Sequence, residues 1–140
     1  ETCALDAVGA SFVRNVEPGE VVVADVHGLR TVKPGNRDKS GICVFEYIYF
    51  ARSDSVIDGI GVYDFRVRAG KRLAQKSKVE ADLVIGVPDS GMDAAAGYSI
   101  ASGIPYGKGF VKNNYVGRTF IQPSQSERVE KVKIKLNVLR

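Results

Sequence analysis

The residues best suited to chemistry lie in segment 81–96, where a short apolar run breaks at a proline and continues as Asp89, Ser90 and Gly91. A helix that starts after such a small-residue turn offers backbone N–H groups and the positive end of its dipole, which together bind phosphate. Ser90 and Asp93 also have the S-x-x-D spacing of a capping box, in which Ser90 would cap the helix. The pattern fits a phosphate-binding turn, and it also fits an ordinary capped helix start.

An α/β fold is expected to position this turn. Residues 83–87 have the length and β-branched composition of a central parallel strand. The helix after the turn is expected to end at Gly103, with Pro105 just beyond it. Residues 105–112 then predict a second parallel strand, which would close a right-handed β-α-β unit.

A second helix is expected before this unit, from Tyr63 to about Ser77. The helical spacing of its apolar residues predicts one buried face, made of Val62, Phe65, Ala69 and Leu73. Most of its cations are expected on a solvated basic face, namely Arg66, Arg68, Lys71, Arg72 and Lys76.

The segments before this helix predict shorter elements. Residues 1–32 indicate short strands joined by turns, with His27 at a turn position that does not suit a catalytic base. Residues 33–41 are the best linker candidate. Residues 42–50 predict a buried strand or extended segment, in which Cys43 would be a small buried hydrophobe and Glu46 would need a partner.

The C-terminal third predicts a loop, a short helix and a strand. Residues 112–123 combine amides, one glycine, two cations and aromatics, which suits a functional loop; a disordered surface loop is the alternative. Ser124 and Glu127 have the spacing of a second capping box. Residues 132–138 alternate between apolar and polar side chains and therefore predict a half-exposed strand.

The composition is that of an ordinary globular chain of 140 residues, with 44% hydrophobic and 26% charged residues. No apolar run reaches the length of a membrane span, and no secretory signal opens the chain, which begins with Glu1 and so suggests an excised or processed piece.

Two distant cysteines match no zinc or redox spacing, so a reducing, cytoplasmic location is expected. A net charge of +4 suits nucleic acid, a membrane surface or a phosphorylated small molecule, although the dispersed cations argue against nucleic acid.

Six stretches are distinctive when taken in order: ETCALD at 1–6, VEPGE at 16–20, CVFEYIYFARSDS at 43–55, VPDS at 87–90, SGIPY at 102–106 and KNNYVGRTFIQP at 112–123. Together they resemble the glutamine phosphoribosylpyrophosphate (PRPP) amidotransferases, also called amidophosphoribosyltransferases. Members of that family catalyse the first committed step of purine synthesis. A glutaminase domain with an N-terminal cysteine nucleophile releases ammonia, and a phosphoribosyltransferase domain uses it to displace pyrophosphate from PRPP, which gives 5-phosphoribosylamine.

The resemblance implies a truncated type I phosphoribosyltransferase core, which is Rossmann-like, preceded by short strands from the end of the glutaminase domain. Residues 1–32 would end the glutaminase domain, 33–41 would be a linker, and 42–140 would be the N-terminal half of the transferase domain. The nucleophile and the later aspartate-pair loop are missing, and Cys3 does not replace that nucleophile. The chain is therefore not expected to be active alone. The alternative is a non-catalytic module that binds nucleotide or phosphate.

The resemblance also implies the residues of the site. Asp89, Ser90 and Gly91 would line the pyrophosphate of PRPP, with the Ser90 hydroxyl on the Mg²⁺ side. Lys112 and Arg118 would be catalytic cations that meet the charge of the leaving group.

Residues 112–123 match a mobile loop of the family that closes on PRPP. In it, Tyr115 and Thr119 would order the closed state and Gly117 would let the loop fold. Asn114 stands where the family usually has arginine, which removes a cation beside the site.

The implied cofactor is Mg²⁺. Cys43 matches one ligand of a [4Fe–4S] cluster in one branch of the family, whereas other members have the cysteine and no cluster. Such a cluster needs four thiolates, so with two cysteines in this chain it would belong to the parent enzyme. The implied partners are PRPP and glutamine as substrates, AMP and GMP as inhibitors, and further copies of the parent in a homo-oligomer. No nucleic acid and no membrane are expected as partners.

Overall fold

The computed structural model describes residues 1–34 and 41–139, so residues 35–40 of the expected linker lie outside the described residues. The chain forms, in order, α1 (Thr2–Ala7), β1 (Val21–Asp25), β2 (Gly28–Lys33), the π-helical turn η1 (Glu46–Phe50), β3 (Val56–Ile57), β4 (Ile60–Gly61), α2 (Val62–Lys76), β5 (Val84–Ile85), α3 (Gly91–Ser102), β6 (Tyr106–Gly107), β7 (Phe110–Lys112), α4 (Gln125–Lys135) and β8 (Leu136–Val138).

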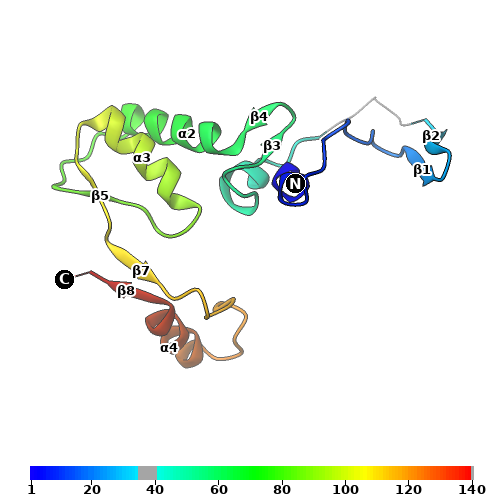
Figure 1. The fold of residues 1–140 in the computed structure, drawn as a ribbon. Helices are drawn as coiled ribbons and strands as arrows, with labels where there is room; N and C mark the ends of the chain where they lie inside the picture. Colours follow the sequence, from blue (N-terminus) through cyan, green and yellow to red (C-terminus); the bar gives the residue numbers. More distant parts are fainter. Residues whose placement is uncertain (35–40, 140) are drawn as a thin grey trace.

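The fold is mixed α/β, with its strands in separate pairs (Figure 1). β5 pairs with β6 in parallel, with Val84 opposite Tyr106, and α3 connects the two strands, which confirms a β-α-β unit. The expected parallel strand over residues 105–112 is correct only for residues 106–107, because residues 110–112 form β7, which pairs with β8 instead. The pairs β1–β2, β3–β4 and β7–β8 are antiparallel. The β1–β2 hairpin and the α4–β8 segment lie at separate ends of the molecule, and α2 packs against α3 in a third region (Figure 1).

Helix α2 is confirmed within one residue at each end, but its buried face differs from the expected one. The buried residues are Val62, Arg66, Gly70 and Ala74, which are four apart, whereas Leu73 is 55% exposed. The reason is that α2 and α3 approach backbone to backbone: a Cβ atom added to Gly70 would lie 1.9 Å from the carbonyl oxygen of Ala94. The small residues of α2 therefore face α3, and Arg66 is buried instead of lying on a solvated face.

Residues 42–50 do not form the expected strand. Residues 44 and 45 are helical and η1 follows them directly. Only Tyr47 of this segment is buried; its ring lies 4.8 Å from that of Phe65 between centroids, and its hydroxyl donates to the Ile57 carbonyl at 3.0 Å. Cys43 is exposed, so its interpretation as a buried hydrophobe is wrong as well. A run that is apolar on both faces does not distinguish a strand from a short helix, because it has no period.

The first 34 residues contain one helix that the sequence did not predict. α1 buries Cys3, and within residues 8–20 no strand forms. The hairpin β1–β2 is present, with Asp25 opposite Gly28, so His27 lies in the turn as expected. The expectation of short strands throughout residues 1–32 is therefore correct only from residue 21 onwards, where β1 and β2 form the hairpin.

The C-terminal segment is more helical than expected. Ser124 accepts a hydrogen bond from the Glu127 N–H, and the Glu127 side chain accepts one from the Ser124 N–H, which confirms the capping box. The helix then runs to Lys135, so residues 132–135 are not the expected strand. Only residues 136–138 pair with β7, because that partner strand is three residues long.

Much of the apolar surface is uncovered. The accessible surface is 10742 Å², against about 7,100 Å² for a compact monomer of this mass. The buried apolar side chains are few, with Tyr47, Ala51 and Val62 forming the main cluster. Among the described residues, no helix has both the length and the apolar character that crossing a membrane requires.

Candidate functional site

The turn between β5 and α3 is the centre of the candidate site. Ser90 is the N-cap residue of α3, yet its backbone is in the helical region and its side chain makes no capping hydrogen bond. The expected Ser90–Asp93 capping box is therefore not formed. The physical reason is that a capping residue has an extended backbone, whereas that of Ser90 is helical. The Asp93 carboxylate instead accepts a hydrogen bond from the Ser53 hydroxyl, in a different segment of the chain.

The backbone N–H groups at the start of α3 are partly engaged. The Gly91 N–H donates to the Val87 carbonyl and the Met92 N–H to the Asp89 carbonyl, both at 3.2 Å. A phosphate bound here would therefore depend on side-chain donors or on a rearrangement of the turn. The Ser90 hydroxyl makes no capping bond and is one such donor.

Lys112 is brought to this turn from the end of β7. Its ammonium group forms an ion pair with the Asp89 carboxylate. The Asp89 side chain is 73% exposed, and that of Lys112 is 24% exposed. The structure thus joins one expected catalytic cation to one expected pyrophosphate residue.

Three cavities meet at the turn. The first, of about 440 Å³, is lined by residues 49–54, Arg66, Asp89 and Ser90. The second, of about 220 Å³, lies between the turn and β6–β7 and includes Lys112 and Asn114. The third, of about 590 Å³, places Ser90 and Gly91 opposite residues 118–121 and α4. Asp89 and Ser90 each line two of them, so the turn is shared by these three cavities.

The expected loop residues are distributed unevenly around these cavities. Arg118 and Thr119 line the third cavity with Ser90, and Thr119 is 4% exposed. The Gly117 carbonyl accepts a hydrogen bond from Lys135 at 3.0 Å, which ties the loop to α4. Tyr115 is fully exposed, and only its backbone N–H has a described contact, to the Asn113 side chain. The structure therefore brings Arg118 and Thr119 to the site but leaves Tyr115 outside it.

The oxygen donors at the turn fit Mg²⁺ only in part. This ion usually takes one or two protein oxygens and completes its shell with water and substrate phosphates, and Asp89 and Ser90 could supply that small set. Among the described residues, no group of three or more His, Cys, Asp or Glu side chains is arranged to hold a metal ion. A [4Fe–4S] cluster does not fit this chain alone, because it needs four thiolates and the chain has only Cys3 and Cys43.

Sequence reasoning missed the residues that support the turn. Arg66, Ser53 and Asp93 form a polar group beside the first cavity. Arg66 could have been found from its four-residue spacing with Val62, Gly70 and Ala74, which are the other buried positions of α2. Ser53 and Asp93 lie 40 residues apart, and no sequence pattern links them.

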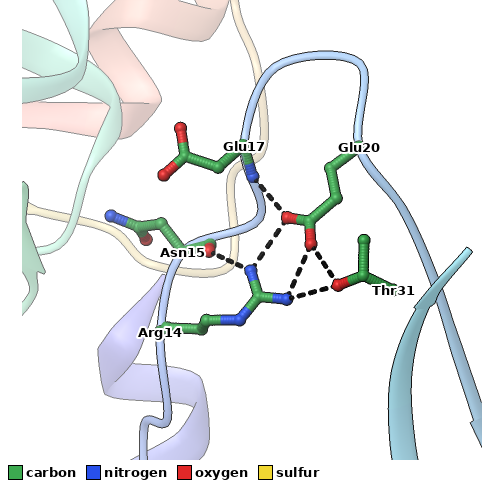
Figure 2. A network of polar contacts seen from close by, with 5 residues as sticks. All are labelled: Arg14, Asn15, Glu17, Glu20 and Thr31. Carbon is green, nitrogen blue, oxygen red and sulfur yellow. Dashed lines mark hydrogen bonds and ion pairs between the residues drawn. The ribbon is translucent and has the colours of Figure 1, made fainter. Parts of the chain in front are cut away.

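A second polar group belongs to the N-terminal hairpin, and its role is structural. The Arg14 guanidinium donates two hydrogen bonds to the Glu20 carboxylate, at 2.7 and 2.8 Å, and the Thr31 hydroxyl of β2 donates to the same carboxylate. Figure 2 shows how these side chains lie. The Arg14 guanidinium, the Glu17 N–H and the Thr31 hydroxyl lower the pKa of Glu20 to about 2. This group joins the segment before β1 to β2.

A third polar group connects α1 to the 52–56 segment. The Glu1 carboxylate accepts hydrogen bonds from the Arg52 N–H and the Ser55 hydroxyl, both at 2.8 Å. The Thr2 hydroxyl accepts from the Val56 N–H at 2.7 Å. Hydrogen bonds from Arg52 and then Ser55 lower the pKa of Glu1. The first helix is therefore held against the segment that leads into the first cavity.

Comparison with known proteins gives one consistent result. No protein-family model matches the chain. Over all 140 residues, however, the chain is 57% identical to the amidophosphoribosyltransferase of Mycobacterium tuberculosis, 53% to that of Archaeoglobus fulgidus and 54% to that of Bacillus subtilis. It spans 26%, 31% and 29% of those relatives, so it corresponds to between a quarter and a third of their length.

Solved structures give the same picture. A structure described as the allosteric regulatory enzyme of purine biosynthesis matches 99% of this chain with a TM-score of 0.83 at 53% identity, and 30% of that structure is covered. The same values hold for the glutamine PRPP amidotransferase of B. subtilis complexed with ADP and GMP. The resemblance to amidophosphoribosyltransferases that the six sequence stretches indicate is thereby confirmed along the chain.

Proposed function

We propose that this chain is a segment of an amidophosphoribosyltransferase, the enzyme that makes 5-phosphoribosylamine from PRPP and glutamine. The observation that carries the proposal is the similarity over all 140 residues, at 53–57% identity, to three relatives that are named for this activity. The arrangement of the turn supports it, since Asp89 and Ser90 lie beside the cations Lys112 and Arg118.

In this proposal, residues 1–32 end a glutaminase domain and residues 42–140 form the first half of a type I phosphoribosyltransferase domain. The parallel pair β5–β6 with α3 between its strands is the part of the structure that supports a Rossmann-like core. The large uncovered apolar surface also favours a segment that packs against further protein, in the same polypeptide or in other copies of a homo-oligomer.

The proposed reaction breaks the bond between C1 of the ribose and a pyrophosphate oxygen, and it forms a bond between C1 and the nitrogen of ammonia. Pyrophosphate leaves with its charge increased, so cations and hydrogen-bond donors must meet it. Lys112 would supply a cation from β7, Arg118 a second from the loop, and Ser90 a hydroxyl from the turn. Mg²⁺, when bound with PRPP oxygens, would add positive charge at the leaving group.

The pairing of Lys112 with Asp89 has a consequence for binding. Pyrophosphate oxygens would compete with the Asp89 carboxylate for the Lys112 ammonium group, so substrate binding is coupled to the opening of this ion pair. Asn114 adds no charge to the second cavity, which leaves Lys112 and Lys108 as the cations lining it.

The loop and the regulatory partners form a further part of the proposal. Thr119 would help to order the closed loop, Gly117 would let it fold, and Tyr115 would be recruited only when the loop closes.

One solved relative is described as complexed with ADP and GMP. Purine nucleotides such as AMP and GMP are accordingly proposed as inhibitors that compete with PRPP near the turn. Cys43 would be a ligand of a [4Fe–4S] cluster only in a parent protein that supplies three more thiolates. The proposed location of the parent protein is the cytoplasm.

The test replaces the matching segment of the B. subtilis relative with this chain, which gives a full-length protein called here the replacement enzyme. It is expected to release pyrophosphate from PRPP when glutamine or ammonia is present, and the unmodified relative is the positive control. A replacement enzyme that folds and assembles as the relative does, but releases no pyrophosphate, would overturn the proposal.

The isolated 140-residue chain gives the complementary measurement. It is expected to show no glutaminase activity and no phosphoribosylamine formation, because the nucleophile and the aspartate-pair loop are absent from it. Binding of AMP or GMP to the isolated chain, together with an inactive replacement enzyme, would instead favour the non-catalytic nucleotide-binding module.

A further inference from the structure

Arg66 is a buried cation, and two of its donor nitrogens are engaged by the 47–51 segment. It is 4% exposed. Its Nε donates to the Tyr47 carbonyl at 2.7 Å, and its Nη2 donates to the Ala51 carbonyl at 2.8 Å. Burying a guanidinium is unfavourable unless its donors are satisfied, and these two bonds fasten the 47–51 segment to α2.

The third contact of Arg66 extends this link to α3. Its Nη1 donates to the Ser53 hydroxyl at 3.1 Å, and that hydroxyl donates to the Asp93 carboxylate. Nη1 also lies 3.8 Å from the same carboxylate. Asp93 is in the first turn of α3, two residues after Gly91. One polar group therefore joins α2, the 51–55 segment and the start of α3.

The packing of the two helices places this group beside the turn. α2 and α3 touch backbone to backbone at Gly70 and Ala94, where no side chain larger than hydrogen fits on Gly70. Arg66 is one helical turn before Gly70, and Asp93 is adjacent to Ala94. The Gly70–Ala94 contact holds the two helices together, and the Arg66–Ser53–Asp93 group adds a polar link in the first turn of α3, close to Asp89 and Ser90 in the chain.

We propose that Arg66 and Asp93 are positioning residues, which hold the 89–91 turn against the first cavity by joining α2 and the 51–55 segment to the start of α3. The inference rests on the proposed function, in which this turn faces the pyrophosphate of PRPP. Two observations favour it. Arg66, Ser53, Asp89 and Ser90 line the same cavity, and Asp93 does not cap its own helix but binds Ser53 instead.

The first test compares Asp93→Ala with Asp93→Asn in the replacement enzyme. The asparagine keeps an acceptor for the Ser53 hydroxyl, and the alanine does not. Asp93→Ala is expected to raise the KM for PRPP about tenfold and to leave the KM for ammonia unchanged, while Asp93→Asn stays within about threefold of the starting KM for PRPP. The exposed Asp82, before β5, gives the matched control Asp82→Ala, with no expected change.

A purely structural role would lower the yield of folded enzyme without separating the two KM values. The inference is overturned if Asp93→Ala leaves the KM for PRPP within twofold, or if Asp93→Asn is as impaired as Asp93→Ala. If Asp93→Ala does not fold, Ser53→Ala replaces it, with the same expected rise in the KM for PRPP. Where both variants fold, the double variant should show no further rise; additive effects would contradict a shared link.

Hydrogen exchange provides a readout that does not need activity. The Gly91 and Met92 N–H groups are bonded to the Val87 and Asp89 carbonyls, so they report on the turn. Asp93→Ala is expected to speed their exchange about tenfold, and Asp82→Ala is expected not to. An inactive replacement enzyme that shows this change would refute the proposed function and retain the positioning role. An active enzyme with unchanged exchange and unchanged KM would refute the positioning role alone.

Discussion

The ammonium group of Lys112 is paired with the carboxylate of Asp89, which joins the end of β7 to the turn before α3. The two residues are 23 positions apart, and α3 and β6 lie between them in the chain. Since the Asp89 side chain is 73% exposed, water and salt screen the pair. The pair therefore contributes little to stability. In the proposed function it holds a cation at the candidate site, where a phosphate of the substrate would replace the Asp89 carboxylate.

Replacing Lys112 by alanine should separate stability from function. Exposed ion pairs typically contribute about 0–1 kcal/mol, so the melting temperature of the replacement enzyme should change by only a few degrees. Pyrophosphate release should fall about 100-fold, because a donor aimed at developing charge is lost. Steady-state kinetics and thermal unfolding check this, with the exposed Lys131→Ala in α4 as the control. A Lys112→Ala enzyme within threefold of the starting rate would exclude Lys112 from the site.

The contact between α2 and α3 leads to a prediction about stability. In Gly70→Ala the new Cβ would lie 1.9 Å from the Ala94 carbonyl oxygen, so the helices must separate. Overpacking of this kind costs about 1–3 kcal/mol, and the variant should melt several degrees lower. Gly41→Ala is the matched control, because no atom lies within 4 Å of its added Cβ. Equal melting temperatures for the two variants would show that the helices are not in backbone contact.

The two cysteines should differ in reactivity in the isolated chain. Cys43 is exposed, whereas Cys3 is buried in α1. Brief treatment with iodoacetamide, followed by peptide mass spectrometry, should therefore find Cys43 alkylated first and Cys3 only after denaturation. Preferential alkylation of Cys3 would contradict the packing of α1. Cys43→Ser should remove the fast reaction and leave the slow one.

The sequence was informative where structure depends on neighbouring residues. The β5–α3–β6 unit, the end of α3 at Gly103 and the Ser124–Glu127 capping box each follow from a local pattern, and each is present. The ion pair between Lys112 and Asp89 agrees with a site at the carboxyl end of the parallel strand β5. The contacts of these two residues with a substrate stay a prediction.

The sequence was misleading where tertiary contact overrides a local pattern. Ser90 and Asp93 have capping-box spacing, yet the box does not form. The Asp93 carboxylate accepts a hydrogen bond from the Ser53 hydroxyl instead, because the 51–55 segment lies against the start of α3. Residues 132–135 alternate as a strand does, but the capped helix continues through them until β7 offers a partner to Leu136. Arg66 is the cation of α2 that departs from the expected solvated face, because charge alone does not reveal which helix face meets a neighbour.

The Arg14–Glu20 pair predicts how the hairpin responds to acid. The pKa of Glu20 lies at about 2, below its usual 4.5, chiefly because the Arg14 guanidinium hydrogen-bonds the ionised carboxylate. A carboxyl group whose pKa is lowered by folding stabilises the folded state fully above its unfolded pKa, and it loses that effect as the pH falls towards the folded pKa. Acid should therefore loosen β1–β2 between about pH 4.5 and pH 2.

Carbon-13 NMR of the Glu20 carboxyl against pH measures this directly in the isolated chain. Arg14→Ala should raise the pKa of Glu20 towards its usual value, because the largest cause of the shift is removed. Glu20→Gln should abolish the acid-dependent rise in hydrogen exchange across β1–β2, whereas Glu130→Gln, on the exposed face of α4, should leave it unchanged. A Glu20 that titrates near 4.5 in the unmodified chain would mean that the contacts drawn in Figure 2 do not persist in solution.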